Sequence, residues 1–249
     1  MLELKSLSRH FGGVRAVDGL DLRVGKGSIV GLIGPNGSGK STTVNLVTGL
    51  FEPTGGQILL EGRDIAKLPT HARLAHGIAR TFQNIRLFGQ LTVWQNLWVA
   101  QNSPEDRARK GFFARWLGGQ RGARDDIVPL LEFSGLAHKR DELASNLAFG
   151  EQRRLEVARA LATRPRLLLL DEPAAGMNSE EIRQLRERIL AIRERGVTIV
   201  LVEHVMELVM GVTDRIAVLN FGQKIAEGTP AEIQRDPVVR KAYLGGEAA

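Results

Sequence analysis

The 249-residue sequence contains no cysteine. A disulfide framework and a thiolate nucleophile are therefore excluded, which fits a reducing compartment. The sequence also lacks any apolar run near the roughly 20 residues needed to cross a bilayer. Its N-terminus does not have the basic-then-apolar order of a secretory signal. These absences predict a soluble, cytoplasmic protein.

Internal repeats and low-complexity tracts are also absent, and the composition is that of a globular domain. Hydrophobic residues make up 43% and charged residues 25% of the chain, which argues against disorder. The net charge is +6. A solvated basic surface, phosphate ligands, an anionic membrane face or nucleic acid would each account for it. Acids interrupt the arginine-dense segment Glu105–Asp126, and no nucleic-acid-binding motif accompanies it, so nucleic acid is the weakest interpretation.

Five short apolar runs predict β-strands. They are Gly27–Gly34, Gln57–Gly62, Arg166–Asp171, Val197–His204 and Arg215–Asn220. Each run is continuous rather than alternating, which is typical of strands covered on both faces. The sequence therefore predicts a mostly parallel sheet.

Helices are predicted between these strands. Ile182, Leu185, Ile189 and Ile192 fall on one helical stripe. Asn178 with Glu181 forms a plausible capping pair, and Gly196 is a natural stop. Thr229–Glu232 begins a second helix with an N-cap, a first-turn proline and an acid. Alternating strands and helices indicate an α/β fold. The stretch from Asn84 to Ala144 contains all three tryptophans and few strand signals, which predicts an inserted helical subdomain.

A glycine-rich segment follows the first of these strands. Gly34, Gly39, Lys40 and Ser41 match the pattern G-x-x-x-x-G-K-[ST], with a helical segment after them. Glycines let successive backbone N–H groups face phosphate oxygens, and the positive end of the helix faces the same anion. Lys40 would reach the β- and γ-phosphates, and the Ser41 hydroxyl would bind Mg²⁺. An exposed lysine in a glycine-rich turn is the alternative.

A strand of four leucines ends in Asp171 and Glu172. Open α/β sheets bind ligands at the carboxyl edge of their strands. Asp171 would hold Mg²⁺, and Glu172 is placed to polarise an attacking water. The alternative, a solvated acidic strand end, is weakened by the phosphate loop earlier in the chain.

Taken in order, the phosphate loop, "TFQN", the segment Asn146–Leu161, "LLLLDEP" and "LVEH" resemble the ATP-binding cassette ATPases over essentially the whole chain. The resemblance implies a P-loop NTPase (RecA-like) core with an N-terminal antiparallel β subdomain, in residues 1–83 and 162–249. Residues 84–161 would form the inserted helical subdomain. Gln83 would sense the γ-phosphate and Mg²⁺, and His204 would contact the γ-phosphate. Phe11 stands where the family places an adenine-stacking aromatic, with core packing as its alternative.

The signature segment of the family, normally Leu-Ser-Gly-Gly-Gln, corresponds here to Leu147–Glu151. Leu147 and Gly150 match, whereas Ala148, Phe149 and Glu151 depart from it. Gly150 allows close backbone approach, and the helix that begins there offers N–H groups to a γ-phosphate held by another subunit. Ala148 removes the serine hydroxyl, so we expect a working signature that does not depend on that hydroxyl.

Three longer stretches resemble the ATPase subunits of bacterial branched-chain amino acid importers: residues 81–100, 174–178 and 221–233. Such a subunit works with separate integral membrane permeases, with a second cassette that is identical or paralogous, and only indirectly with a substrate-binding protein. It would lie on the inner face of the membrane. Ile85, Phe88, Leu91 and Trp94 would border the groove for a permease helix, although we expect at least half of them to pack in the helical core.

The sequence therefore predicts an ATPase that uses ATP and Mg²⁺ and does not act on nucleic acid. Another transported substrate, such as lipid, urea or lipopolysaccharide, remains open, as do a soluble ATPase acting on DNA or ribosomes and a non-catalytic regulator. The predicted catalytic residues are Lys40, Gln83, Glu172 and His204, and the predicted metal ligands are Ser41, Gln83 and Asp171. The predicted nucleotide contacts are Phe11, Gly34, Pro35, Asn36, Gly37, Ser38, Gly39, Lys40, Ser41, Thr42, Leu147, Ala148, Phe149, Gly150 and Glu151.

Overall fold

The computed structural model describes residues 1–101 and 121–244. Within them the chain forms two compact units, one from Met1–Arg80 with Arg166–Ala249 and the other from Thr81–Pro165. The sequence placed the inserted helical segment at 84–161. Most of the arginine-dense segment Glu105–Asp126 lies outside the described residues.

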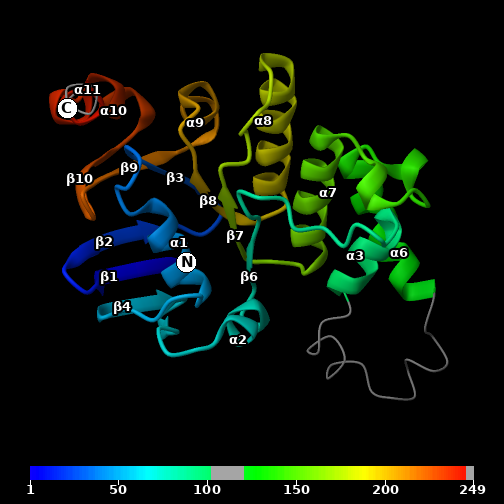
Figure 1. Ribbon diagram of the computed structural model, residues 1–249, viewed down its shortest axis with the longest axis horizontal. Helices are drawn as coiled ribbons and strands as arrows, with labels where there is room; N and C mark the ends of the chain where they lie inside the picture. Colours follow the sequence, from blue (N-terminus) through cyan, green and yellow to red (C-terminus); the bar gives the residue numbers. More distant parts are fainter. Residues whose placement is uncertain (102–120, 245–249) are drawn as a thin grey trace. The chain divides into compact units, whose positions relative to one another are not determined.

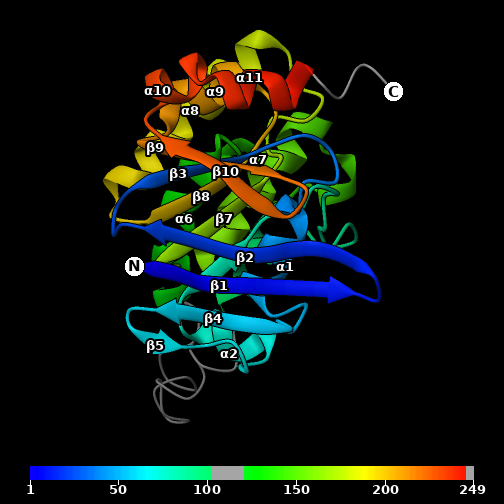
Figure 2. The same cartoon turned by 90° about the vertical axis from the view of Figure 1, so that its left-hand side faces the viewer.

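The first unit contains two β-sheets (Figures 1 and 2). The larger has six strands in the order β10-β9-β3-β8-β7-β6, all parallel except the antiparallel pair β9 and β10. Its strands are β3 (Ile29–Ile33), β6 (Ile78–Arg80), β7 (Leu167–Asp171), β8 (Thr198–Val202), β9 (Arg215–Asn220) and β10 (Gln223–Gly228). This confirms the predicted mostly parallel sheet.

The smaller sheet is antiparallel, with the order β2-β1-β4-β5. Its strands are β1 (Leu2–Phe11), β2 (Val14–Val24), β4 (Gly55–Leu60) and β5 (Arg63–Asp64). The placement of Gln57–Gly62 with the doubly covered strands was therefore wrong. Ile58 and Leu60 are buried while Leu59 is only half-buried. That alternation is the pattern of a strand with one covered face.

Alternate residues of the large sheet belong to two different hydrophobic clusters. Leu32, Leu169 and Val202 share one cluster with the antiparallel sheet and helix α1 (Lys40–Thr48). Ile33, Ile216 and Val218 share the other with helices on the opposite face. Because side chains alternate along a strand, β3 and β9 contribute to both layers. The remaining helices of this unit are α2 (Thr70–Ala75), α8 (Ser179–Glu194), α9 (Met206–Val212), α10 (Pro230–Arg235) and α11 (Pro237–Leu244).

Helix α8 has the amphipathic form that the sequence predicts. The stripe Ile182, Leu185, Ile189 and Ile192 is buried. At its start the Asn178 side chain accepts a hydrogen bond from the amide of Glu181 at 3.0 Å, and the Glu181 carboxylate accepts one from the Asn178 amide at 2.9 Å. Thr229 and Glu232 cap α10 in the same reciprocal way. Both predicted caps are confirmed.

The second unit is helical. Its elements are α3 (Val93–Gln101), α6 (Arg121–Ser134), the 3₁₀ turns η1 (Ala137–Lys139) and η2 (Ala144–Asn146), and α7 (Phe149–Ala162). Leu155, Ala158 and Leu161 of α7 are buried, as the periodicity of that segment predicts. None of the helices in the described parts of the chain is both apolar enough and long enough to span a membrane.

Candidate functional site

The glycine-rich segment forms a tight loop between β3 and α1. Gly34 has φ +151°, and a Cβ there would overlap the carbonyl oxygen of Leu219. Gly39 has φ +105° at the N-cap of α1, where a Cβ would overlap the carbonyl oxygen of Ala16. Only glycine satisfies both the backbone angle and the close approach at these two positions. The conformation of the loop therefore depends on these two glycines.

Lys40 is the first residue of α1, and its side chain folds back into the loop. Its Nζ donates hydrogen bonds to the carbonyl oxygens of Gly34 at 2.7 Å and Pro35 at 2.9 Å. Burial lowers the pKa of Lys40 below its usual value, while the negative charges of Glu172 and Asp171 oppose that shift. The loop, the buried ammonium and both predicted acids thus share one electrostatic site.

Ser38 and Ser41 present hydroxyl groups at the same loop. The Ser38 hydroxyl is buried and has no hydrogen-bond partner among the described residues. Such an atom costs free energy unless a ligand satisfies it. Ser41, Asn36 and Gly37 are exposed, and Pro35 and Thr42 are half-buried. A glycine cradle with an unsatisfied buried hydroxyl fits an oxygen-rich anion such as a nucleotide phosphate.

The turn between β9 and β10 is hydrogen-bonded both to the phosphate loop and to β2, the strand that pairs with β1. The amide of Gly222 donates to the carbonyl oxygen of Ser38 at 3.0 Å, and its own carbonyl accepts from the amide of Asp18 at 2.9 Å. Asp18 belongs to β2, which pairs with β1 as far as Phe11.

Phe11 is 39% exposed, so it is not a core residue. The Arg9 guanidinium lies 4.5 Å from its ring centroid, and the Phe51 ring meets it edge-on at 5.3 Å.

Asp171 ends β7 and is buried in an ion pair. An Arg80 nitrogen lies 2.6 Å from the Asp171 carboxylate, and the other terminal nitrogen of Arg80 donates to the side chain of Asn45 at 2.6 Å. Asn45 lies on α1, so Arg80 links the helix after the phosphate loop to the acid at the end of β7. No local sequence pattern points to Arg80, because its partners are distant in the chain.

Glu172 and His204 face each other at the carboxyl ends of β7 and β8. The His204 Nδ1 lies 3.9 Å from a Glu172 carboxylate oxygen, and the His204 side chain is 58% exposed. Glu172 has φ +48°, an unfavourable angle for a residue with a side chain. Its amide donates to the carbonyl oxygen of Val202 at 2.8 Å.

Glu203 lies between β8 and His204 and was not predicted as a site residue. It is fully buried. Its carboxylate accepts hydrogen bonds from three amides, those of Ala174 at 2.7 Å, His204 at 2.8 Å and Val205 at 3.1 Å. An acid that directly follows a buried apolar strand was the available sequence signal.

In the second unit, helix α7 holds the segment that contains Gln83. Arg153 donates to the carbonyl oxygens of Phe82 at 2.8 Å and Gln83 at 2.5 Å. Glu156 accepts from the amides of Phe82 at 3.3 Å and Arg86 at 3.4 Å. Burial raises the pKa of Glu156, and these amides and the nearby Arg153 oppose the shift. Gln83 itself is exposed.

The signature segment forms the start of the same helix. Ala148 is the N-cap of α7, and Glu151 accepts from the Ala148 amide at 3.1 Å and from Lys139 at 2.9 Å. Burial by itself raises the pKa of Glu151, but these two bonds outweigh it and the pKa lies below its usual value. Leu147 is buried and Phe149 is 53% exposed. Gly150 is the second residue of the helix and is half-buried.

Four residues predicted to border a partner groove are not core residues. Phe88 is 51% exposed, and Ile85, Leu91 and Trp94 are half-buried. The expectation that at least half of them pack in the core was therefore wrong. The buried amide of Asn96 organises this loop instead, since it bonds both the N–H and the C=O of Phe88 and the C=O of Leu91.

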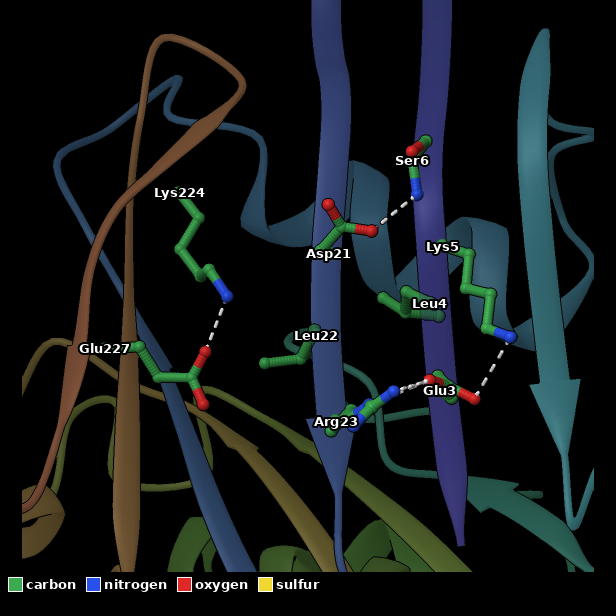
Figure 3. A pocket seen from close by; sticks show the side chains of 9 residues that line it. All are labelled: Glu3, Leu4, Lys5, Ser6, Asp21, Leu22, Arg23, Lys224 and Glu227. Carbon is green, nitrogen blue, oxygen red and sulfur yellow. Dashed lines mark hydrogen bonds and ion pairs between the residues drawn. The ribbon is translucent and has the colours of Figure 1, made fainter.

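A pocket of about 490 Å³, away from the phosphate loop, lies on β1, β2 and β10 of the first unit (Figure 3). Its charged side chains are paired with neighbouring groups. Arg23 bonds Glu3 at 2.7 Å, Lys224 bonds Glu227 at 2.5 Å, and the amide of Ser6 donates to Asp21 at 2.8 Å. No unsatisfied buried atom among the described residues points into it. The phosphate loop is the better candidate for the functional site.

Comparison with known proteins agrees with this geometry. Residues 17–175 match the family model of the ABC transporter, and residues 223–249 match that of the branched-chain amino acid ATP-binding cassette transporter. The chain is 45% identical to the high-affinity branched-chain amino acid transport ATP-binding protein BraF of Pseudomonas aeruginosa, over 98% of both proteins.

Solved structures of ATP-binding cassettes have the same fold. The ADP conformation of an ATP-binding cassette of an ABC transporter superposes with a TM-score of 0.87 at 31% identity, covering 98% of each chain. A dimeric cassette in a post-hydrolysis state, bound to ADP and Pi, superposes with a TM-score of 0.78 at 25% identity, covering 92% of this chain and 99% of that one. The chain therefore belongs to the ABC transporter family, as an ATP-binding cassette ATPase.

Proposed function

We propose that this ATPase energises the import of branched-chain or other hydrophobic amino acids through separate integral membrane permeases. The observation that carries the assignment of the catalytic residues is the buried Lys40 ammonium in a glycine-shaped loop, under the influence of Asp171 and Glu172. The substrate class is supported by the likeness to BraF and by the match of residues 223–249. The subunit would work on the inner face of the cell membrane.

In this proposal the phosphate loop and Phe11 bind the nucleotide. The backbone N–H groups of residues 34–42 bind phosphate oxygens, and Ser38 gains the partner that it lacks. Lys40 exchanges two carbonyl oxygens for the β- and γ-phosphates, which compensates an ammonium that burial destabilises. Phe11 stacks on adenine with the face opposite Arg9.

Mg²⁺ fits the donor atoms of this site. Within the first unit, Ser41 and Asp171 would supply hydroxyl and carboxylate oxygens; Gln83, the third proposed ligand, carries an amide oxygen and belongs to the second unit. No set of three or more His, Asp or Glu side chains in the described ranges could hold a metal by itself. That agrees with Mg²⁺, which takes one or two protein ligands together with phosphate oxygens and water. When bound, the ion neutralises charge on the phosphates.

Hydrolysis is assigned to Glu172 and His204. Glu172 accepts a proton from a water whose oxygen bonds to the γ-phosphorus, while the bond from that phosphorus to the bridging oxygen breaks. His204 contacts the γ-phosphate and lies 3.9 Å from Glu172, so the two act at one point. Gln83 senses the γ-phosphate and Mg²⁺.

Two cassettes, identical or paralogous, would close head to tail around two ATP molecules. The start of α7 in one cassette then faces the γ-phosphate held by the phosphate loop of the other. Gly150 and its neighbours offer main-chain N–H groups there. The dimeric relative bound to ADP and Pi supports this arrangement. Reopening after hydrolysis moves the permeases.

The test replaces the native gene with a Lys40→Ala variant and measures uptake of radiolabelled leucine by the cells. We expect loss of uptake, and the purified variant should lose ATP binding because its phosphate loop has no ammonium. Lys26→Ala, at an exposed lysine near the same sheet, is the control and should behave as wild type. Unchanged ATP affinity in Lys40→Ala would overturn the phosphate-loop assignment. Unchanged leucine uptake with loss of urea uptake would overturn the substrate class.

A further inference from the structure

Glu203 is a buried carboxylate for which the proposed mechanism has no role. It follows β8 directly, and its side chain is inaccessible to solvent. Within the described residues the only basic side chain within 4.0 Å of its carboxylate is the His204 imidazole, at 3.7 Å. A buried carboxylate is costly unless hydrogen bonds or charges compensate it. Three main-chain amides provide that compensation, and they come from two separate segments.

The two segments are those that carry Glu172 and His204. Ala174, two residues after Glu172, donates to one carboxylate oxygen of Glu203 at 2.7 Å. His204 and Val205 donate to the other oxygen at 2.8 and 3.1 Å. One side chain therefore ties the segment after β7 to the segment after β8.

Glu172 is bracketed by this tie and by a main-chain bond. Its own amide donates to the carbonyl oxygen of Val202 at 2.8 Å, and two residues later Ala174 donates to Glu203. Between these bonds Glu172 holds φ +48°. A residue with a side chain keeps such an angle only when its surroundings impose it. The two bonds of the bracket constrain the main chain on both sides of Glu172.

We propose that Glu203 is a positioning residue that holds Glu172 in this conformation and at a fixed distance from His204. The inference deepens the proposed function, because it rests on Glu172 and His204 acting together in hydrolysis. Because its side chain is inaccessible to solvent, Glu203 would not contact a bound nucleotide. Its loss should therefore change turnover and leave nucleotide binding in place.

Glu203→Gln is the first test. A glutamine has a single oxygen acceptor, and its NH₂ group must face either the Ala174 amide or the His204 and Val205 amides, so one side of the tie is lost. We expect kcat to fall at least about tenfold, because misplacing a reacting group by a fraction of an ångström is enough to cause this. The KM for ATP and the Kd of ATP should stay within about threefold of wild type, since the phosphate loop is intact.

Thr198→Val is the matched control. Thr198 begins the same strand at its other end, is fully buried, and accepts a hydrogen bond from the Gly27 amide at 3.0 Å. This variant should lose stability but keep the wild-type kcat. A purely structural role for Glu203 would make the two variants alike, with either both or neither losing turnover, and that result would overturn the proposal.

Hydrogen exchange tests the tie made by Glu203 independently of whether the chain hydrolyses ATP. In Glu203→Gln either the Ala174 amide or the His204 and Val205 amides should exchange faster, and all three should exchange at the wild-type rate in Thr198→Val. Unchanged protection of all three amides in Glu203→Gln overturns the tie, even if the chain were found to hydrolyse nothing. If Glu203→Gln does not fold, Glu203→Asp decides the same comparison, because it keeps the charge but is one methylene too short to reach both segments.

Discussion

Gly150 occupies the second position of α7, where a backbone N–H points out of the helix. Its neighbours Ala148 and Phe149 lack side-chain oxygens, and the Glu151 carboxylate is held by the Ala148 amide and by Lys139. The groups left to meet an anion from another subunit are therefore mainly those of the main chain. This makes the proposed role of Gly150 sensitive to charge.

Gly150→Asp should reduce ATPase activity at least about tenfold, because a carboxylate near the phosphate repels it by more than ~1.4 kcal/mol. The same acid suits the first turn of a helix, so thermal stability should be kept. Ala231→Asp, at the corresponding position of α10, is the control and should keep full activity. Normal turnover in Gly150→Asp would rule out the signature role.

The sequence brought out Lys40, Asp171, Glu172 and His204 because each stands in a short motif next to a recognisable strand or helix. It did not bring out Arg80 or Glu203. Arg80 pairs with Asp171 across 91 positions, and Glu203 accepts from Ala174 across 29. Contacts of this kind depend on which strands become neighbours, and strand order is not readable from local periodicity.

For individual helices and strands, the predictions that the structure confirms depend on local chemistry. The apolar stripe and the N-terminal capping pair of α8 depend only on some twenty consecutive residues, and both are present in the structure. Gln57–Gly62 was assigned to the wrong kind of sheet because three apolar residues in a row read as a doubly covered strand. In the structure only the alternate residues Ile58 and Leu60 are buried. A run this short cannot distinguish one covered face from two.

Helix α1, which follows the phosphate loop, is held at its far end by a buried arginine. Arg73 of α2 is 1% exposed. Its guanidinium donates to the carbonyl oxygens of Leu46 and Val47 at the end of α1, and to those of Ala66 at 2.8 Å and Leu68 at 2.8 Å. Burial lowers the pKa of Arg73, and Asp64 opposes the shift. The positive charge faces the negative end of the α1 dipole.

Arg73→Met should lower the free energy of unfolding by about 3 kcal/mol, because three buried carbonyl groups and the half-buried one of Leu68 lose an arginine donor at once. Urea denaturation followed by circular dichroism measures this change. Arg183→Met removes an arginine whose side chain is 62% exposed and should leave the midpoint unchanged. A similar midpoint for the two variants would show that the carbonyl groups find other donors.

At the scale of the whole molecule, the phosphate loop belongs to the first unit and the signature segment to the second. Each chain therefore carries one loop and one signature segment, and under the proposed head-to-tail arrangement two chains would complete two sites. Short sequence motifs predicted both the phosphate loop and the signature segment. They did not predict the contacts of Arg153 and Glu156 in α7 with the segment that contains Gln83. Through these contacts the Gln83 segment and the signature segment, which both belong to the second unit, are joined.

Glu172→Gln tests this arrangement, because it removes the proposed base and keeps the phosphate loop. ATP turnover should fall by about 10²–10⁴-fold, the usual contribution of a general base, while ATP affinity stays near wild type. Since ATP is then bound but not cleaved, the closed pair of cassettes should persist. Light scattering should show a doubled mass with Mg-ATP and a single mass without nucleotide or in Lys40→Ala. Wild-type turnover would remove Glu172 from the mechanism. Lost turnover without the doubled mass, even when a paralogous cassette is added, would reject the head-to-tail pair.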